Sequence, residues 1–395
     1  MPWLGVSPMD LRLRFITEYL TELYTVTELA AMHGISRKTA YYWINHYRRE
    51  GLGRLEGASR RPHHVPRATP PDIVAQLEAV RDRYPSWGAG KIRDHLVHTR
   101  PDTAWPCRDT IHVILTRSGR VRRRRRRGLA GPPPTQLTVP TEANLVWTVD
   151  FKGEFRTGDG VACYPFTLRD GYSRFVLRCV GLTGTRGPDT SRQFARAFAE
   201  YGLPTCIRSD NGPPFGARQA LAGLSRLAVG WLRLGIRPER IRPGCPGENG
   251  SHEQFHAVLK RETARPPAPT LAAQQRRFNR FVSEYNHVRP HDGAGHRPPA
   301  ARYSPSPRPL PARLPLPDYP LTATVRRVST AGQVKWLGRS LFLSTVLAEQ
   351  DVAFEPTDDG VWLVRFGPMP LAIFHERTWR LVTPSASSPT PPPRS

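Results

Sequence analysis

Cysteine and acidic residues are scarce in this sequence. Its 395 residues include 33 Asp and Glu against 58 Lys and Arg. The five cysteines are Cys107, Cys163, Cys179, Cys206 and Cys245, and they form no CxxC pair or other metal-binding spacing. This pattern excludes a zinc module and a disulfide framework, and we interpret the thiols as those of a protein in a reducing cytoplasm.

Long hydrophobic runs are missing as well. No stretch of apolar residues is long enough to span a membrane, so we expect no membrane association. Asp10, Arg12 and Arg14 interrupt the amino-terminal segment, so we expect no signal peptide. The chain is also too long for one small core and favours several domains.

The excess of basic residues gives a formal net charge of +25. Such a charge predicts a polyanionic partner and binding that weakens steeply with salt. A high-GC genome is an alternative source of arginine, since 42 prolines and 32 glycines are typical of the same bias. That bias does not concentrate six arginines in one run, Arg122, Arg123, Arg124, Arg125, Arg126 and Arg127.

The arginine run has two interpretations. It can be a phosphate-binding arm that inserts into a minor groove, or it can be a solvated disordered tract. Both descriptions hold together if the segment becomes ordered only on DNA.

Residues 1–58 have the pattern of a helix-turn-helix unit. A helical segment begins near Val26, Gly34 occupies the turn, and Ser36 can cap the helix that follows. The first turns of a recognition helix read base edges in the major groove. The candidate DNA contacts in those turns are Arg37, Lys38, Thr39 and Tyr42. An ordinary helical hairpin with solvated basic residues is the alternative.

Three acidic residues follow local patterns that could bring carboxylates to one site. Asp150 ends the apolar run 145–149, Asp210 closes the short strand-like segment 206–209, and Glu253 lies just inside a probable helix. Mg²⁺ prefers carboxylate oxygens. Two such ions about 4 Å apart can activate a nucleophile and stabilise a leaving oxygen. The three acids therefore predict metal-dependent phosphodiester chemistry.

Each acid also has a simpler explanation. A single Asp at the end of a strand is usually a turn former or a helix cap. Glu248 is an alternative to Glu253, and the two would lie about 7 Å apart if both were helical, so they are not interchangeable. Asp170 is interpreted as structural, and Asp159 as a hairpin-turn residue.

Four segments resemble, in sequence and in order, the integrase-core DDE transposases of bacterial insertion sequences, which share a catalytic fold with retroviral integrases. They are VWTVDF at 146–151, RSDNGPPF at 208–215, PGENGSHE at 246–253 and YNHVRPH at 285–291. The interval between Asp210 and Glu253 departs from most of that family by being longer. We expect the additional residues within 216–240, which has helical character.

The resemblance implies a catalytic triad of Asp150, Asp210 and Glu253 that holds two Mg²⁺ or Mn²⁺ ions. Lys260, two helical turns after Glu253, would contact DNA phosphate. Arg289 and His291 could also contact phosphate, but they could equally pin the end of the catalytic domain. These residues and the arginine run complete the predicted DNA-binding set.

The implied function is that of a DNA transposase. It would bind the terminal inverted repeats of an insertion sequence, cleave the element ends and join them to target DNA. Its partners would be double-stranded DNA and further copies of itself, as a homodimer or larger assembly at the bacterial nucleoid. One alternative is a catalytically inactive DNA-binding regulator on the same fold, and another is a ribonuclease or structure-specific nuclease.

The fold class that follows is multidomain, with helical units ahead of an α/β core and a small β domain. The core would have three strands, a helix, a strand and a helix, which is the ribonuclease H-like order. The predicted segments after the first unit are a second helix-turn-helix or winged-helix-like unit at 68–127, a linker at 128–143, the catalytic core at 144–303, a Pro-rich linker at 304–318, an SH3-like β-barrel at 319–382 and a disordered tail at 383–395.

Overall fold

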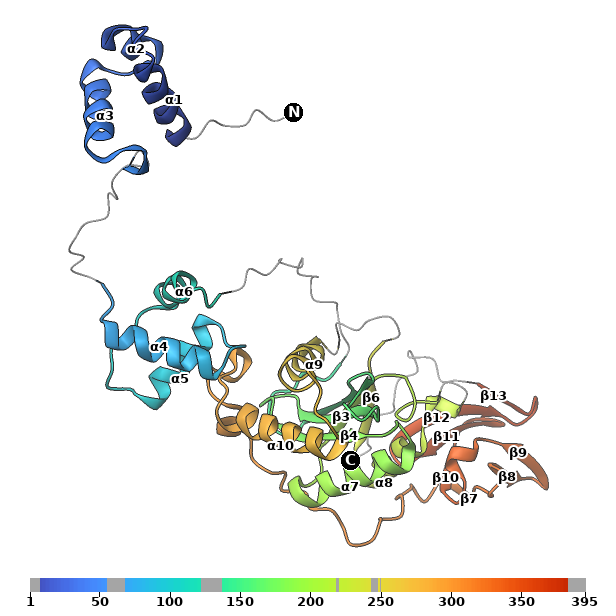
Figure 1. Cartoon of the computed structure of the whole chain (residues 1–395). Helices are drawn as coiled ribbons and strands as arrows, with labels where there is room; N and C mark the ends of the chain where they lie inside the picture. Colours follow the sequence, from blue (N-terminus) through green and yellow to red (C-terminus); the bar gives the residue numbers. More distant parts are fainter. Residues whose placement is uncertain are drawn as a thin grey trace. The chain divides into compact units, whose positions relative to one another are not determined.

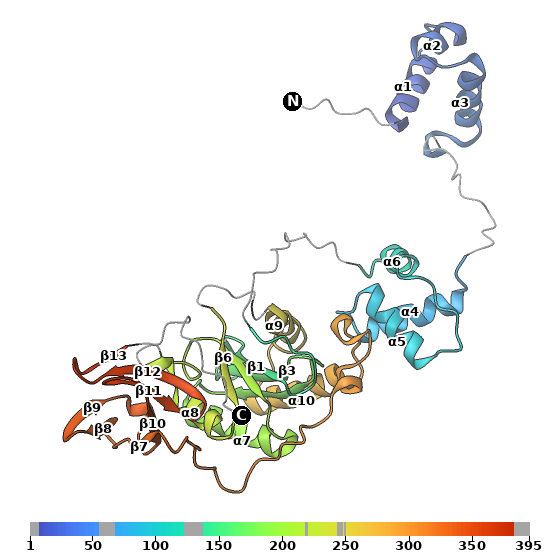
Figure 2. The ribbon, with the colours of Figure 1, turned by 180° about the vertical axis from the view of Figure 1, so that it is seen from behind.

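The structure is a computed structural model, and it describes residues 8–54, 68–121, 137–217, 220–242, 248 and 250–382 (Figures 1 and 2). Two compact units divide at Pro70. None of the helices in the described ranges is long and apolar enough to cross a membrane. The arginine run 122–127 and the predicted tail 383–395 lie outside the described residues.

The first unit is the predicted helix-turn-helix. It contains α1 (Pro8–Leu20), α2 (Val26–Met32), α3 (Arg37–Glu50) and a short 3-10 turn, η1 (Leu52–Arg54). Thr25 and Glu28 form a reciprocal cap that starts α2. Gly34 adopts φ +63° in the turn, and the Ser36 hydroxyl accepts from the Thr39 amide at 3.1 Å to start α3. A small core that includes Phe15, Ile16, Leu29, Ala30, Ala40 and Ile44 holds the helices together.

A second helical group opens the other unit, as the sequence predicts. It contains α4 (Pro71–Arg83), α5 (Ala89–Thr99) and α6 (Arg108–Arg117). Trp87 is fully buried between them and stacks on Tyr84 at 4.0 Å between ring centroids. Residues 68–121 contain no strand, so this part of the chain shows no wing.

The core contains a mixed sheet with the predicted ribonuclease H-like order. Its strands are β1 (Val146–Phe151), β2 (Phe155–Arg156), β3 (Ala162–Asp170), β4 (Val176–Leu182), β5 (Cys206–Ser209) and β6 (Arg237–Arg240). β3 is antiparallel to both β1 and β4, whereas β5 runs parallel to β1 and β6 runs parallel to β5. The helices are α7 (Gly187–Tyr201), α8 (Arg226–Arg233), α9 (Gly250–Thr263) and α10 (Leu271–His287).

The two faces of this sheet have different chemistry. Successive side chains of a strand point to opposite faces. On β1, Trp147 and Val149 enter the apolar layer formed with α7 and α8. Thr148 and Asp150 therefore point to the other face, where α9 lies (Figure 1). Each large apolar side chain buried in the first layer contributes about 1.5–3 kcal/mol of stability.

The predicted insertion at 216–240 is partly helical and partly extended. It contains a 3-10 turn, η2 (Leu221–Gly223), and α8, and then β6, which pairs with β5 at the sheet edge. The sequence did not predict β6, because its four residues, RPER, show no apolar alternation. Pairing with β5 decides its conformation.

The SH3-like barrel predicted at 319–382 is not confirmed. The structure has an open antiparallel sheet in the order β13–β12–β11–β10–β7, and β8–β9 is a separate hairpin. Barrel closure requires the two edge strands to pair. Here Trp336 of the hairpin stacks on Phe354 of the sheet at 4.5 Å, so aromatic packing holds the hairpin. The strands are β7 (Thr324–Arg327), β8 (Gln333–Trp336), β9 (Arg339–Phe342), β10 (Asp351–Asp358), β11 (Val361–Phe366), β12 (Met369–His375) and β13 (Arg380–Val382).

Asp170, at the end of β3, is fully buried and structural. Its carboxylate accepts hydrogen bonds from the Asn144 amide at 2.8 Å, the Ser173 amide at 2.7 Å and the Ser173 hydroxyl at 2.6 Å. It therefore closes the turn between β3 and β4 and anchors the segment that enters β1.

Replacement of Asp170 by Ala should lower the free energy of unfolding by about 3 kcal/mol or more, because each buried group left without a partner costs about 1–3 kcal/mol. Urea denaturation measures this loss. Asp170→Asn retains one acceptor oxygen and should lose less, and the exposed Asp318→Ala is the control. Equal midpoints for Asp170→Ala and Asp318→Ala would contradict the structural role.

Candidate active site

Asp150 lies on the face of β1 that is covered by α9. Its side chain is 24% exposed. Burial raises its pKa to about 7, and the charges of Asp210 and Glu253 act in the same direction. The structure therefore brings the three predicted acids within electrostatic reach of one another.

Asp210 follows β5, the parallel neighbour of β1. Thr148 pairs with Arg208 in these strands, and the same register two residues further places Asp210 level with Asp150. Burial raises the pKa of Asp210, and a hydrogen bond from the Gly212 amide to its Oδ1 at 3.2 Å opposes that shift. A Cβ on Gly212 would lie 3.2 Å from Asp210 Oδ2, so a side chain there would crowd the carboxylate.

Glu253 lies in the first turn of α9 with its side chain exposed. The neighbouring His252 and His256 are buried on the face of α9 that contacts the sheet. Glu248, the alternative acid, has a different role. Its carboxylate accepts from the Arg242 amide at 2.7 Å and from Arg242 Nε at 2.6 Å, and these bonds lower its pKa. The Glu248 carboxylate therefore serves as the partner of Arg242.

The three acids fit a divalent cation by their donor chemistry. In the part of the chain that the structure describes, no lysine or arginine forms an ion pair with Asp150, Asp210 or Glu253. Carboxylates that repel one another and form no ion pair with lysine or arginine are a suitable donor set for Mg²⁺ or Mn²⁺.

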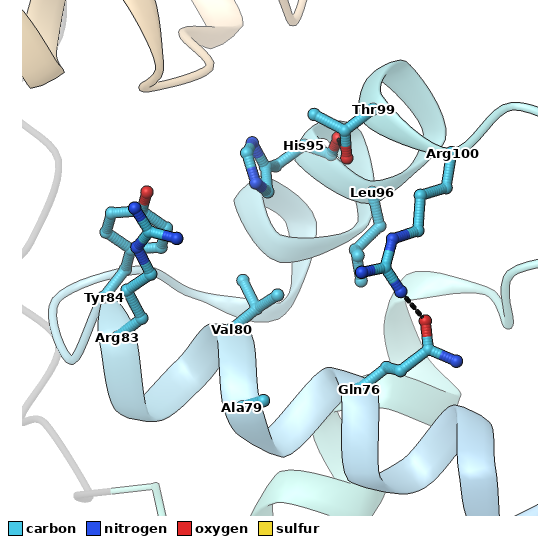
Figure 3. Close-up of a pocket in the computed structure, with 9 residues that line it drawn as sticks. All are labelled: Gln76, Ala79, Val80, Arg83, Tyr84, His95, Leu96, Thr99 and Arg100. Carbon is cyan, nitrogen blue, oxygen red and sulfur yellow. Dashed lines mark hydrogen bonds between the residues drawn. The ribbon is translucent and has the colours of Figure 1, made fainter.

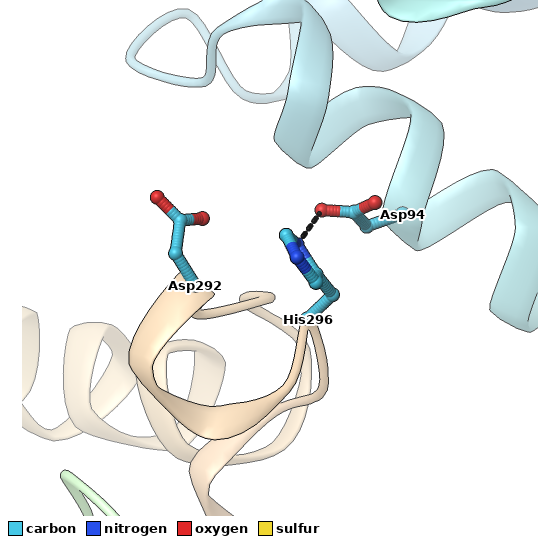
Figure 4. Close-up of side chains that lie close together, drawn as sticks. All are labelled: Asp94, Asp292 and His296. Carbon is cyan, nitrogen blue, oxygen red and sulfur yellow. Dashed lines mark hydrogen bonds and ion pairs between the residues drawn. The ribbon is translucent and has the colours of Figure 1, made fainter.

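A different group of side chains has the most closely spaced potential metal-ligand atoms. Among the described residues, Asp94, Asp292 and His296 alone place three potential ligand atoms within 4.8 Å of one another (Figure 4). His296 Nδ1 lies 2.9 Å from Asp94 Oδ2, and the Lys91 ammonium lies 3.7 Å from Asp292 Oδ1. Because this ammonium already neutralises the acids, we interpret the group as an ionic contact between α5 and the 3-10 turn η4 (Asp292–Ala294).

A cavity of about 240 Å³ lies between α4 and α5 (Figure 3). Val80 and Leu96 supply apolar walls, and Arg83 and Arg100 lie at its rim. None of the predicted site residues lines this cavity. It is therefore separate from the three acids.

The predicted DNA-contact residues of α3 are placed at its start. Arg37, Lys38 and Tyr42 are exposed, whereas Thr39 is half-buried and its hydroxyl lies 2.8 Å from the Ser36 hydroxyl. On α9, Lys260 is exposed and lines a small cavity together with Lys152. The cavity lies beside the end of β1, and the charge of Lys152 opposes the rise in the pKa of Asp150.

Arg289 and His291 are placed differently. The Arg289 guanidinium is 4% exposed and donates to Glu262 Oε1 at 2.8 Å. His291 packs on Tyr285 at 4.4 Å between ring centroids, and burial lowers its pKa. Of the two interpretations, pinning the end of the domain describes this geometry, since neither side chain presents a free donor to DNA.

Four polar residues beside the acids were not predicted from the sequence. Thr148 and Thr167 come from β1 and β3, and His252 and His256 come from α9. The i, i+4 spacing of the histidines around Glu253 was an available signal. The threonines required the strand register, which the sequence does not contain.

The raised pKa of Asp150 has a consequence for stability. Between the ordinary Asp pKa of about 3.9 and about 7, the folded protein holds a proton that the unfolded chain has released. Without metal, stability should therefore fall as pH rises through this window, by up to about 1.4 kcal/mol per pH unit, and stay low above pH 7.

Asp150→Asn removes this titration, so the variant should gain stability over the wild type between pH 5 and pH 8. Urea midpoints in EDTA at both pH values measure the gain. The control is Asp159→Asn, because hydrogen bonds from Thr157 and Val161 lower the pKa of that exposed carboxyl. A constant difference between Asp150→Asn and wild type at both pH values would contradict the shift.

Sequence comparison with known proteins identifies domain families in this chain and two homologous proteins. Two families described as Integrase core domain match residues 140–246 and 234–299. Families described as Helix-turn-helix domain and Homeodomain-like domain match residues 11–63 and 39–115.

Two relatives are encoded by insertion elements. An uncharacterised 39.2 kDa protein of insertion element IS476 from Xanthomonas euvesicatoria is 27% identical over 254 residues, 62% of this chain and 70% of that protein. An uncharacterised 31.7 kDa protein of insertion element IS407 from Burkholderia multivorans is 29% identical over 183 residues, 46% of this chain and 62% of that protein.

Similar solved structures are viral integrases. The HTLV-2 integrase catalytic core in complex with magnesium has a TM-score of 0.31 and 14% identity, and the match covers 42% of this chain and 99% of that one. A chain of the simian T-cell lymphotropic virus intasome in complex with PP2A regulatory subunit B56 gamma has a TM-score of 0.36 and 15% identity, and the match covers 74% of this chain and 97% of that one. The sequence matches give this chain an integrase core domain with helix-turn-helix domains ahead of it, and homology to proteins of bacterial insertion elements.

Proposed function

We propose that this protein is a DNA transposase that binds the terminal inverted repeats of its element, cleaves the element ends and joins them to target DNA. One observation carries the proposal. Burial raises the pKa of Asp150 on β1 to about 7, and the charges of Asp210 after β5 and Glu253 on α9 act in the same direction. A site that gathers unpaired carboxylates at a cost in stability is typical of catalysis.

The three carboxylates would hold two Mg²⁺ or Mn²⁺ ions. When bound, the ions would activate water and neutralise charge on the phosphate and the leaving oxygen. The protein's own contribution is positioning. β1 and β5 would present Asp150 and Asp210 at the same level, and α9 would bring Glu253 to them. The reaction is an in-line transfer at phosphorus, without a covalent enzyme intermediate, that frees a 3′-hydroxyl able to attack target DNA.

DNA recognition is divided between domains. The exposed start of α3 offers Arg37, Lys38 and Tyr42 to base edges. Lys260, seven residues after Glu253 on α9, would bind a phosphate next to the site of cleavage, and Lys152 from the same small cavity could assist. Because two element ends must be held together, we infer a homodimer or larger assembly on DNA.

Asp150→Asn, Asp210→Asn and Glu253→Gln should each lower cleavage and strand joining by at least about 10²- to 10³-fold, because catalysis here depends on positioned charge. The assay uses the purified chain, Mg²⁺ or Mn²⁺, and oligonucleotides copied from the DNA that flanks the gene. Each variant should still bind that DNA.

Asp159→Asn is the control for the loss of a carboxylate, and it should cleave as the wild type does. Substantial joining by any of the three variants would contradict the triad. Specific binding by the wild type without cleavage under either metal would instead indicate a DNA-binding regulator.

Arg37→Ala and Lys38→Ala in α3 should each weaken binding to element-end DNA by about 1–3 kcal/mol if the residue reads a base edge. Binding to unrelated DNA of the same length should change less. Fluorescence anisotropy at fixed salt measures both. Arg49→Ala, near the far end of the same helix, is the matched control, and an equal loss in all three variants on both DNAs would contradict base reading by α3.

A further inference from the structure

A buried polar cluster joins α9 to the sheet directly beneath the proposed catalytic acids. It consists of Thr148, Thr167, His252 and His256, which we call the threonine–histidine cluster. Their exposed fractions are 5%, 0%, 0% and 4%. Buried polar side chains stabilise a fold only when their hydrogen bonds are complete, so the arrangement of this cluster is informative.

The Thr167 hydroxyl is the centre of the cluster. Thr167 pairs directly with Asp150 across β1 and β3. Its oxygen lies 2.9 Å from the Asp150 main-chain oxygen, 2.7 Å from His252 Nε2 and 2.8 Å from His256 Nε2. One hydroxyl therefore connects both histidines of α9 to the backbone of the residue that carries the first acid.

The proton count determines how these bonds are made. A main-chain carbonyl only accepts, so Thr167 donates its single proton to Asp150. Both Nε2 atoms must then donate to the Thr167 oxygen, which sets the tautomer of both histidines. His252 Nδ1 is left as an acceptor and lies 3.0 Å from the Thr148 hydroxyl. His256 Nδ1 is left as an acceptor that faces Asp150 Oδ2 at 3.6 Å.

The hydrogen bonds of the threonine–histidine cluster set the position of Glu253. His252 and His256 are one helical turn apart and bracket Glu253 in the sequence, so their bonds allow one rotation of α9 against β1 and β3. Arg169 of β3 adds a further tie, because its guanidinium donates to the Ser251 carbonyl at 2.9 Å. Apolar contacts of Phe255 and Leu259 hold the helix in place, but apolar packing lacks this directional control.

We propose that Thr167, His252 and His256 are positioning residues that set Glu253 against Asp150 and thereby determine the affinity of the site for divalent cations. The inference rests on the proposed function, since it assigns a support to the same three acids. Partners of this kind that orient metal ligands change metal affinity or activity by about 10- to 100-fold when they are removed.

Thr167→Val and Thr167→Ser separate the hydroxyl from the shape of the side chain. The measurement is the affinity of the full chain for Mn²⁺ by titration calorimetry, without DNA. Thr167→Val should weaken Mn²⁺ binding by about 10- to 100-fold, whereas Thr167→Ser should bind as the wild type does. Wild-type affinity in Thr167→Val, or equal losses in both variants, would overturn the proposal.

Gln275→Leu is the control for an effect on Mn²⁺ binding that comes only from a loss of stability. Gln275 of α10 accepts from the Gly181 amide at 2.9 Å and donates to the Cys179 carbonyl at 3.0 Å, and both of these residues lie on β4, two strands from β1. Gln275→Leu should lower the unfolding midpoint and leave Mn²⁺ affinity unchanged. If Thr167→Val does not fold, His256→Leu against His256→Gln repeats the comparison, because Gln can keep a donor near the position of Nε2.

Asp150→Asn separates a failure of the proposed function from a failure of the positioning role. It should abolish the Mn²⁺ binding that Thr167→Val only weakens. Unchanged Mn²⁺ binding in Asp150→Asn would place the ions elsewhere and overturn the proposed function together with this inference. Loss of binding in Asp150→Asn with wild-type affinity in Thr167→Val would leave the proposed function standing and overturn the positioning role alone.

Discussion

The alternation of side chains along β1 is the constraint on which the rest of the core depends. Trp147 and Val149 enter an apolar layer with α7 and α8, so Thr148 and Asp150 must face α9. The threonines on this second face are buried, so they need hydrogen-bond partners from the helix that covers them. The two histidines of α9 provide these partners.

The same arrangement lowers the stability of the metal-free protein in favour of a site that can bind a divalent cation. Asp150 is largely buried, the charges of Asp210 and Glu253 raise its pKa further, and no lysine or arginine of the described residues forms an ion pair with any of the three acids. The metal-free site is therefore strained by repulsion above neutral pH, and a bound divalent cation would relieve it. By contrast, Asp170 at the opposite end of the neighbouring strand has three hydrogen-bond donors and serves the fold.

Prediction from the sequence succeeded where the signal was local. Helix caps such as Ser36, the apolar run before Asp150 and the turn after Asp210 each follow from adjacent residues. It failed where contacts between distant residues decide. β6 is a strand only because β5 lies beside it. The barrel predicted at the carboxy-terminal end is an open sheet because alternation specifies strands but not the closure of their edges.

The sequence by itself determined the three acids, their order, the helix-turn-helix and the ribonuclease H-like succession of elements, because motifs and periodicity are encoded in neighbouring residues. Three contacts follow from long-range packing instead: Thr167 pairs with Asp150, two histidines bond the Thr167 hydroxyl, and Arg289 pairs with Glu262. Strand register and helix rotation decide those contacts, and both result from packing residues that are far apart in the chain.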